Sequence, residues 1–243
     1  MSRLRADLLL VERGLFESRA KARAAIEAGG VTADGVPVSR ASQMLDAEAV
    51  VEARAAHRWV GRGALKLEAA LQLWPVRPEG RVVLDVGAST GGFTEVCLDR
   101  GASCVYAVDV GRGQLHPRLA ADPRVVDLSG TDARELTAAV LAPPPSLVVC
   151  DASFIGLAKV LPVPLSLAAP GAELVALVKP QFELGPDQVG KGGLVRDAAA
   201  HEAALRAVIT ELDRLGWAAK ASAESPVRGG EGAIEYLLWA ARD

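Results

Sequence analysis

Short apolar runs separated by polar, glycine-containing stretches recur along the chain from residue 61 to its end. Each run has the length of a buried strand, and helical patterns such as residues 65–73 lie between the runs. This alternation predicts a doubly wound α/β domain of the Rossmann-like type, with helices on both faces of its sheet. The strands are expected at residues 82–86, 104–109, 124–127, 146–151, 172–179, 216–223 and 233–240.

The pattern differs near the N-terminus, where two short helical segments come first. Residues 7–12 and 18–28 are predicted to be helices, with Asp7 and Ser18 capping their N-termini. The Gly29-Gly30 pair is a strong signal for the end of the second helix. The N-terminal segment is therefore expected to begin as a pair of short helices.

A strand hairpin is predicted after these helices. Residues 31–38 read as two short strands about an Asp34-Gly35 turn, and an alternating strand follows near residues 48–53. The chain therefore divides into a small α+β domain, a short linker and a large α/β domain. The expected boundaries are 1–58, 59–63 and 64–243.

Composition agrees with a globular chain of this size. The chain has 243 residues, 50% of them hydrophobic and 23% charged, which allows one large and one small domain. It has no uninterrupted apolar run of about 18 residues and no signal-peptide core, so we expect no membrane association and a cytoplasmic location. Cys97, Cys104 and Cys150 lack the spacing of metal ligands and are predicted to be buried, reduced thiols.

Basic residues gather at the N-terminus although the net charge is −3. The first 23 residues carry six Lys or Arg against three Asp or Glu, which favours a local nucleic-acid contact over a uniformly basic surface. A solvated helix face is the alternative. The candidate RNA-binding residues are Arg3, Arg5, Arg19, Lys21 and Arg23.

The apolar run at 82–86 leads directly into a glycine loop that opens a helix near Phe93. Glycines allow a tight turn and close approach to a ligand, and the first N–H groups of the helix point toward that ligand. Asp109 lies 22 positions after Gly87, near the spacing of about 20 expected for an acid that binds a ribose hydroxyl. Because the loop lacks a phosphate-binding lysine, it favours adenosine without a pyrophosphate, as in S-adenosylmethionine.

Two other interpretations of this loop stay open. Gly87-Ala88-Ser89-Thr90-Gly91 also fits the nucleophile elbow of hydrolases, with Asp151 and His201 following in the required order. That elbow follows a central strand, whereas 82–86 is predicted to be the first strand of the sheet. The loop could also be a glycine turn with no ligand.

Charged residues end several of the predicted strands. Asp109, Asp151 and Lys179 each follow an apolar run, and open α/β sheets bind ligands at the carboxyl ends of their strands. A carboxylate and an ammonium at the ends of neighbouring strands suggest one shared site.

The motifs together carry a resemblance to known families. The two helices, the basic Arg19–Arg23 turn, Gly29-Gly30 and the hairpin resemble, over residues 3–58, the RNA-binding domain named for ribosomal protein S-four. The whole chain resembles the TlyA family of ribosomal RNA 2′-O-methyltransferases, which have an FtsJ-like catalytic domain and were once called hemolysins. The motifs are Arg62–Leu67, Asp85–Thr94, Asp151–Ile155, Val178–Glu183 and Gly229–Tyr236.

The resemblance implies a catalytic set and a cofactor loop. The family's Lys-Asp-Lys-Glu set falls on Lys66, Asp151, Lys179 and Glu235. Asp109 corresponds to the ribose acceptor, and Asp132 stands where relatives often carry an amide, which puts the adenine contact there in doubt. The residues implied to bind S-adenosylmethionine are Gly87, Ser89, Thr90, Gly91, Gly92, Phe93, Asp109 and Asp132.

These residues fit methylation of a ribose hydroxyl. Lys179 can accept the hydroxyl proton once it has lost its own, a state that desolvation and neighbouring positive charge favour. Asp151 would hold that lysine, Glu235 would orient Lys66 or the ribose, and no metal is needed. The expected substrate is cytidine in ribosomal subunits; the alternatives are a membrane-lytic protein, as the old name suggests, and a catalytically silent RNA-binding protein.

Overall fold

The computed structural model describes residues 2–229 and 232–242. Gly230 and Glu231, part of the last motif, lie outside the described residues. The chain divides into two compact units, Met1–Arg58 and Trp59–Asp243, each of which is described by itself.

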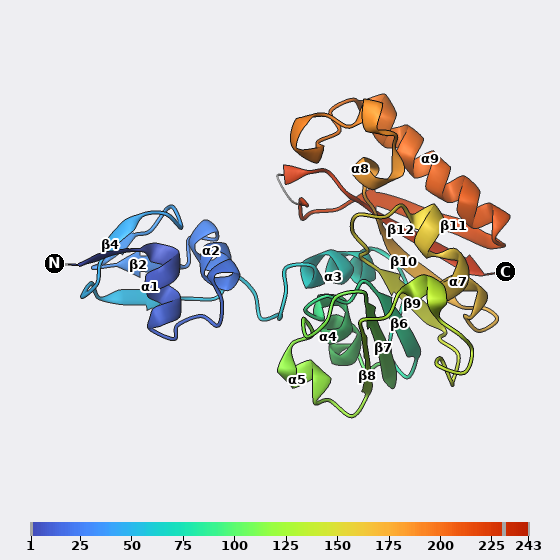
Figure 1. Cartoon of the computed structure of the whole chain (residues 1–243), viewed down its shortest axis with the longest axis horizontal. Coiled ribbons are helices and arrows are strands. Elements are labelled where there is room, and N and C mark those ends of the chain that lie inside the picture. The colour runs from blue at the N-terminus through green and yellow to red at the C-terminus, as the bar shows by residue number, and fades with distance from the viewer. Residues whose placement is uncertain (1, 230–231, 243) are drawn as a thin grey trace. The chain divides into compact units, whose positions relative to one another are not determined.

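The first unit combines two helices with short strands (Figure 1). Helices α1 (Ala6–Glu12) and α2 (Arg19–Glu27) pack on each other. Strand β1 (Arg3–Arg5) pairs with β4 (Met44–Asp46), and β2 (Val31–Ala33) lies between β3 (Val36–Pro37) and β5 (Val51–Ala53). The core consists of small and aliphatic side chains from these elements, among them Leu10, Ala22, Ile26 and Val31. The predicted α+β organisation of the N-terminal segment is therefore present.

The turn and cap predictions for this unit have different outcomes. Asp34 and Gly35 both have positive φ, +50° and +75°, as a two-residue hairpin turn requires. Ser18 caps α2 by accepting from the backbone N–H of Lys21. The prediction that Asp7 caps α1 is wrong, because the helix begins at Ala6 and the Asp7 carboxylate is taken up by two arginine side chains.

The second unit is built on one mixed sheet. In the described residues it has seven strands in the order β11-β12-β10-β9-β6-β7-β8. Strands β6 to β10 pair with one another in parallel, and β12 runs antiparallel to both β10 and β11. The strands are β6 (Val82–Val86), β7 (Cys104–Asp109), β8 (Val125–Ser129), β9 (Leu147–Cys150), β10 (Glu173–Val178), β11 (Trp217–Glu224) and β12 (Tyr236–Arg242).

Helices cover both faces of this sheet (Figure 1), which confirms the doubly wound fold. Side chains alternate along β6, so that Val83 packs in one hydrophobic cluster and Leu84 in the other. One cluster includes α3 (Ala64–Leu73), α4 (Gly92–Asp99) and α5 (Pro117–Ala120); the other includes α6 (Leu157–Val160), α7 (Pro162–Ser166) and α9 (Ala198–Arg214). The remaining helical segments are α8 (Pro180–Glu183), η1 (Ala133–Glu135), η2 (Pro186–Gln188) and η3 (Lys191–Gly193).

Strand boundaries follow the apolar runs most closely in the middle of the sheet. Strands β6 and β7 have the predicted ends, whereas β8 ends two residues later than expected. Strand β12 begins at Tyr236 rather than at residue 233, because the carbonyl of Ala233 accepts from the backbone N–H of Gly229. Of the cysteines, Cys97 and Cys150 are buried as predicted and Cys104 is only partly buried; all are free thiols.

Residues 59–63, predicted to be a linker, pack as part of the second unit. Trp59 and Val60 are buried in the cluster that contains α3 and α4. The indole N–H of Trp59 donates to Glu68 at 3.0 Å, and the backbone N–H of Val60 donates to Glu95 at 2.5 Å. This segment therefore has a fixed place on the second unit.

Candidate active site

The four predicted catalytic residues are brought together by the strand order of the second unit. Asp151 follows β9 and Lys179 follows β10, and these strands are parallel neighbours in which Cys150 pairs with Ala176. Strand β12 is antiparallel to β10, with Tyr236 opposite Val178, so Glu235 lies at the same edge of the sheet. Lys66 comes from the first turn of α3.

Lys179 is surrounded by acceptors from the segment that follows β9. Its Nζ atom lies 2.8 Å from Oδ1 of Asp151. The same amine donates to the hydroxyl of Ser153 at 2.7 Å and to the Asp151 carbonyl at 3.2 Å. The side chain is buried, with 6% of it exposed. A carboxylate, a hydroxyl and a backbone carbonyl together therefore fix the position of a buried amine.

Lys66 and Glu235 complete a network centred on Asp151. The amine of Lys66 lies 2.5 Å from Oε2 of Glu235 and 3.8 Å from Oδ2 of Asp151. Lys66 and Glu235 are buried, and Asp151 is partly exposed. Two amines and two carboxylates alternate in this network, so each buried charge faces an opposite one, as burial of charge requires.

Backbone approaches the acidic members of this network closely. A Cβ atom at Gly229 would lie 2.2 Å from Oε1 of Glu235, and one at Gly63 would lie 3.1 Å from Oδ2 of Asp151. Because real Cβ atoms do not approach other heavy atoms to 2.2 Å, glycine at 229 is what lets the loop cover Glu235.

The glycines of the predicted cofactor loop serve the packing of the chain itself. Gly87 and Gly91 have φ values of +83° and +94°. A Cβ atom at Gly87 would lie 2.9 Å from the Ala152 backbone, and one at Gly91 would lie 2.3 Å from Leu119. Gly92 is similarly close to the backbone of Ala64. The structure shows that these glycines approach neighbouring chain segments closely, and their close approach to a ligand stays a prediction.

The carboxylate of Asp109 binds the backbone of the loop at Ser89. The Asp109 carboxylate accepts from the backbone N–H groups of Ser89 at 2.8 Å and Gly111 at 2.7 Å. Ser89 and Thr90 are exposed at the tip of the loop, and Ser89 has a φ of +48°. The side chain of Phe93, by contrast, is buried in the core, which leaves only its backbone to face a ligand.

Asp132 is engaged within its own turn. Its carboxylate accepts from the backbone N–H of Arg134 at 2.9 Å and pairs with the Arg134 guanidinium at 2.6 Å. These bonds hold the pKa of Asp132 below its ordinary value. The carboxylate that stands in place of the usual amide is thus occupied by an arginine.

Asp85 belongs to this region and was not among the predicted site residues. It is fully buried in β6, and Oδ2 accepts from the Thr94 hydroxyl at 2.6 Å. Oδ1 has no hydrogen-bond partner among the described residues. An acid inside an apolar run was the signal that could have identified it. A free buried acceptor, the Asp109 carboxylate and an exposed loop tip together fit S-adenosylmethionine, which carries positive groups and ribose hydroxyls.

Phe154 is a second residue that the sequence analysis missed. Its side chain is 92% exposed, and its backbone has a φ of +66°, which is strained for a residue other than glycine. The ring lies 5.4 Å from the ring of Phe182, centroid to centroid, and Phe154 directly follows the Ser153 that binds Lys179. An exposed aromatic ring is therefore carried by the residue that follows Ser153 in the sequence.

The hydrolase alternative is wrong, because the three required side chains do not meet. Asp151 is paired with lysines. His201 is buried, and its Nε2 lies 2.9 Å from the carbonyl of Val195. The hydroxyl of Ser89 donates to Gln114. No acid–histidine–serine chain is formed.

The predicted RNA-binding residues of the first unit are largely ion-paired. Arg5 and Arg19 both bind the buried carboxylate of Asp7, at 3.0 Å and 2.7 Å. These bonds lower the pKa of Asp7 to about 2. Along α2, Lys21 pairs with Glu17 and Arg23 with Glu27, whereas Arg3 is exposed. Arg5 and Arg19 are therefore held in place by a buried carboxylate.

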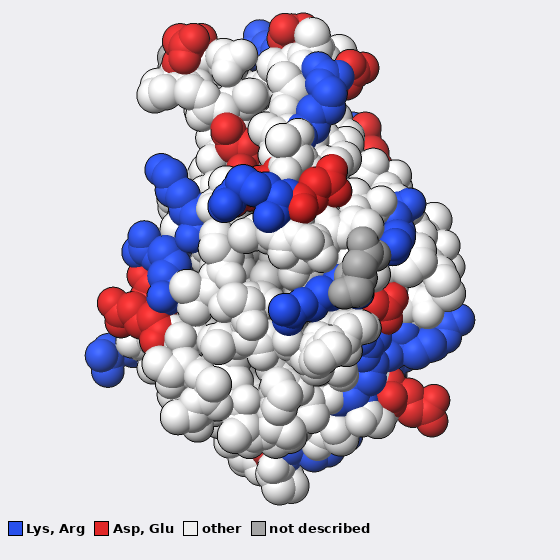
Figure 2. All heavy atoms as spheres, turned by 90° about the vertical axis from the view of Figure 1, so that its right-hand side faces the viewer, with Lys and Arg blue, Asp and Glu red and all other residues white. Residues whose placement is uncertain are grey.

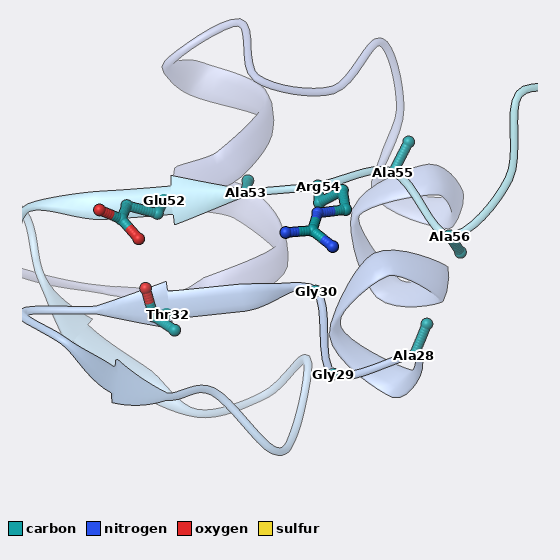
Figure 3. Close-up of a pocket in the computed structure, with 9 residues that line it drawn as sticks. All are labelled: Ala28, Gly29, Gly30, Thr32, Glu52, Ala53, Arg54, Ala55 and Ala56. Carbon is teal, nitrogen blue, oxygen red and sulfur yellow. The ribbon is translucent and has the colours of Figure 1, made fainter.

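A pocket of about 470 Å³ opens in the first unit and contains none of these arginines. Figure 3 shows it between the end of α2 and the strands β2 and β5, with mostly small lining residues. They are Ala28, Gly29, Gly30, Thr32, Glu52, Ala53, Arg54, Ala55 and Ala56.

The described residues contain no group of three or more His, Cys, Asp or Glu side chains arranged to hold a metal ion. Among them, no helix combines the length and the apolar character needed to span a membrane.

The sequence matches the FtsJ-like methyltransferase family over residues 59–242 and the S4 domain over residues 4–51. It is 48% identical over 239 residues to the 16S/23S rRNA (cytidine-2′-O)-methyltransferase TlyA of Mycobacterium tuberculosis, covering 98% of this chain and 89% of that protein. The chain belongs to the TlyA family of FtsJ-like methyltransferases. The resemblance inferred from the motifs is confirmed.

Members of the TlyA family have been named in two ways. Hemolysin A of Brachyspira hyodysenteriae is 36% identical over 235 residues, covering 96% of this chain and 98% of that protein. A solved structure from Streptococcus thermophilus, named a hemolysin, is 37% identical with a TM-score of 0.79, covering 100% of this chain and 89% of that chain. This TlyA-family chain is an S-adenosylmethionine-dependent methyltransferase with an S4 domain.

Proposed function

We propose that this protein transfers the methyl group of S-adenosylmethionine to the ribose 2′-hydroxyl of a cytidine in ribosomal RNA. The observation that carries the proposal is the buried Lys179 amine, which Asp151 and Ser153 hold at the carboxyl ends of β9 and β10. The ribosomal RNA substrate follows from the name and the close similarity of the Mycobacterium tuberculosis relative.

Lys179 is proposed to be the general base. A ribose hydroxyl holds its proton too tightly to lose it unaided at neutral pH, so a base must be held within hydrogen-bond distance. S-adenosylmethionine, when bound, supplies an electrophilic methyl group. Lys179 in its neutral form then takes the hydroxyl proton at Nζ, while Asp151 and Ser153 keep that atom at one place.

Lys66 is proposed to supply positive charge next to the base. Its amine is bound by Glu235 and lies 3.8 Å from Asp151. Glu235 keeps Lys66 in place and balances its charge.

The first unit is proposed to hold structured RNA through its arginines. The S4 domain match covers the elements that carry Arg5 and Arg19, and phosphate contacts by arginine bind RNA without reading its sequence. Figure 2 shows a face of the second unit, and most of the middle and lower part of that face is uncharged. A role on ribosomal RNA also favours a cytoplasmic location.

The decisive experiment incubates the purified protein with ribosomal subunits and S-adenosylmethionine carrying a labelled methyl group. We expect label in ribosomal RNA, and mapping of ribose methylation should find it at the 2′-oxygen of a cytidine. Leakage of liposomes without incorporation of label would support a membrane-lytic protein instead.

A Lys179→Met variant tests the catalytic assignment. Loss of a general base is expected to lower the rate by about 10²- to 10⁴-fold, with S-adenosylmethionine still bound. Lys159→Met, on the exposed face of α6 in the same unit, is the matched control and should retain full activity. A Lys179→Met protein that methylates at the wild-type rate would contradict the mechanism.

A further inference from the structure

Asp85 is a buried carboxylic acid that the proposed reaction scheme does not use. It is the fourth residue of β6 and has no exposed surface. Thr94 on α4 donates its hydroxyl to Oδ2, whereas Oδ1 lacks a partner among the described residues. An unsatisfied buried carboxylate oxygen is costly. The position therefore favours either a proton on Asp85 or a positive group beside it.

The groups around Asp85 oppose a negative charge on it. Burial raises the pKa of Asp85 to about 7, and the nearby carboxylates of Asp151 and Asp109 add to this effect. Thr94 acts in the opposite sense through its hydroxyl and its backbone N–H. Burial raises the pKa of the thiols of Cys97 on α4 and Cys150 on β9, and the charge of Asp85 adds a smaller effect in the same direction.

The cofactor must place positive charge at this edge of the sheet. Its methyl group has to reach an oxygen held beside Lys179, and Lys179 is bound by Asp151. Asp151 already acts on Asp85 through its charge. A sulfonium near Asp151 would act on Asp85 from a similar place with the opposite sign, and would favour the ionised carboxylate.

We propose that Asp85 is a proton-linked positioning residue for the cofactor, ionised beside the sulfonium of S-adenosylmethionine and protonated when the site is empty or holds S-adenosylhomocysteine. Binding of the donor then releases one proton from the carboxyl group to solvent. After methyl transfer the sulfur is uncharged, and the carboxylate takes one proton back. Asp85 thereby holds the donor more tightly than the product. The inference rests on the proposed function, because it requires the donor to bind at the glycine loop.

Calorimetric titration of the full-length protein with each cofactor tests this linkage. The titrations run from pH 6 to pH 8 in buffers with different ionisation enthalpies, which counts the protons exchanged. For a carboxyl group that titrates near 7, the affinity for S-adenosylmethionine should rise about tenfold over this range, with up to about one proton released at the acidic end. The affinity for S-adenosylhomocysteine should change by less than about threefold.

Two variants assign the proton to Asp85. Asp85→Asn removes the titrating group and should abolish both the pH dependence and the proton release for S-adenosylmethionine. Thr94→Val removes the hydrogen bond that lowers the pKa of Asp85 and should move the rise in affinity to higher pH. An affinity that is independent of pH in the wild-type protein, or an unchanged pH dependence in Asp85→Asn, would overturn the proposal.

A measurement on the wild-type protein covers the case in which Asp85→Asn fails to fold. Carbon NMR of labelled aspartate carboxyl groups should find one that titrates near pH 7 in the free protein. S-adenosylmethionine should lower its midpoint and S-adenosylhomocysteine should leave it unchanged; the same midpoint with both ligands would overturn the proposal. A protein that binds no S-adenosylmethionine at any pH would overturn the proposed function as well, whereas binding without proton exchange would overturn this inference alone.

Discussion

Lys66 and Glu235 lie 169 positions apart in the sequence, yet their charged atoms are 2.5 Å apart in the folded protein. Both side chains are buried. Lys66 lies in the first turn of α3, and Glu235 is the residue immediately before β12. The pair therefore connects the beginning and the end of the second unit at the edge of the sheet where Lys179 is held.

Glu235→Gln should destabilise the protein and lower its activity. The substitution leaves the buried Lys66 amine without its nearest counter-charge, and breaking a buried ion pair in this way costs about 3–5 kcal/mol. Urea unfolding measures the loss. The double variant Lys66→Met, Glu235→Gln removes both charges and should recover a large part of the stability without recovering activity. A single variant as stable as the wild type would show that the pair does not stabilise the fold.

Gly229→Ala should displace Glu235 without touching the cofactor loop. The new methyl group would come within 2.2 Å of Oε1 of Glu235, so the carboxylate has to move away from Lys66. We expect at least a roughly tenfold fall in methylation rate, since small misplacements of a catalytic group are costly. Calorimetry should find unchanged affinity for S-adenosylmethionine, and an unchanged rate would show that the loop yields instead.

Phe154→Ala should weaken the use of RNA and leave folding intact. The ring is 92% exposed, so it contributes little to the core, and its place beside Ser153 suits stacking on a base of the substrate. Base stacking on an aromatic ring is worth about 1–3 kcal/mol, which corresponds to a loss of roughly 5- to 150-fold in kcat/KM.

The rate of methylation of ribosomal subunits by Phe154→Ala is best compared with the rates of two other variants. Phe154→Trp should restore most of the activity because it keeps an aromatic ring. Leu73→Ala removes another exposed apolar side chain of the second unit, 58% exposed, and should be neutral. An equal loss in Leu73→Ala would mean that exposed apolar surface in general, rather than this ring, supports the reaction.

Asp7→Asn should reduce the acid sensitivity of the first unit. Hydrogen bonds from Arg5 and Arg19 lower the pKa of Asp7 from 3.8 to about 2. An acid whose pKa is lowered by folding contributes stability that is fully present above about pH 4 and is lost as the pH falls through about 2. The variant lacks this contribution at neutral pH and should show a shallower decline in stability below pH 4.

Acid titration followed by circular dichroism, together with RNA binding, distinguishes the roles of Asp7. Without the carboxylate the two guanidiniums are no longer held, so the affinity for RNA should fall even at neutral pH, where the unit is folded. Glu12→Gln, an exposed position on the same helix, is the control and should change neither property. Wild-type affinity for RNA in Asp7→Asn would show that the arginines need no fixed position.

Part of the site could be predicted from the sequence, because several of its residues lie at the ends of predicted strands. Asp109, Asp151 and Lys179 each follow an apolar run, and strand ends gather at one edge of a parallel sheet. Glu235 and Lys66 carry no such signal; they entered only through the resemblance to a family. Asp85 carried a signal, an acid inside an apolar run, that was given no role, whereas the exposure and backbone φ of Phe154 are not visible in a list of residues.

The sequence by itself determined the elements and their type, because apolar periodicity and glycine turns act over a few neighbouring residues. It also determined that a glycine loop and an acidic strand end would meet. Only the tertiary structure decided that Asp7 binds two arginines instead of capping a helix and that the loop glycines accommodate Ala152 and Leu119. It also decided that Oδ1 of Asp85 has no hydrogen-bond partner in the part of the chain that the structure describes. These outcomes depend on which distant segments come into contact, and contact over long sequence separations is set by the packing of the whole domain.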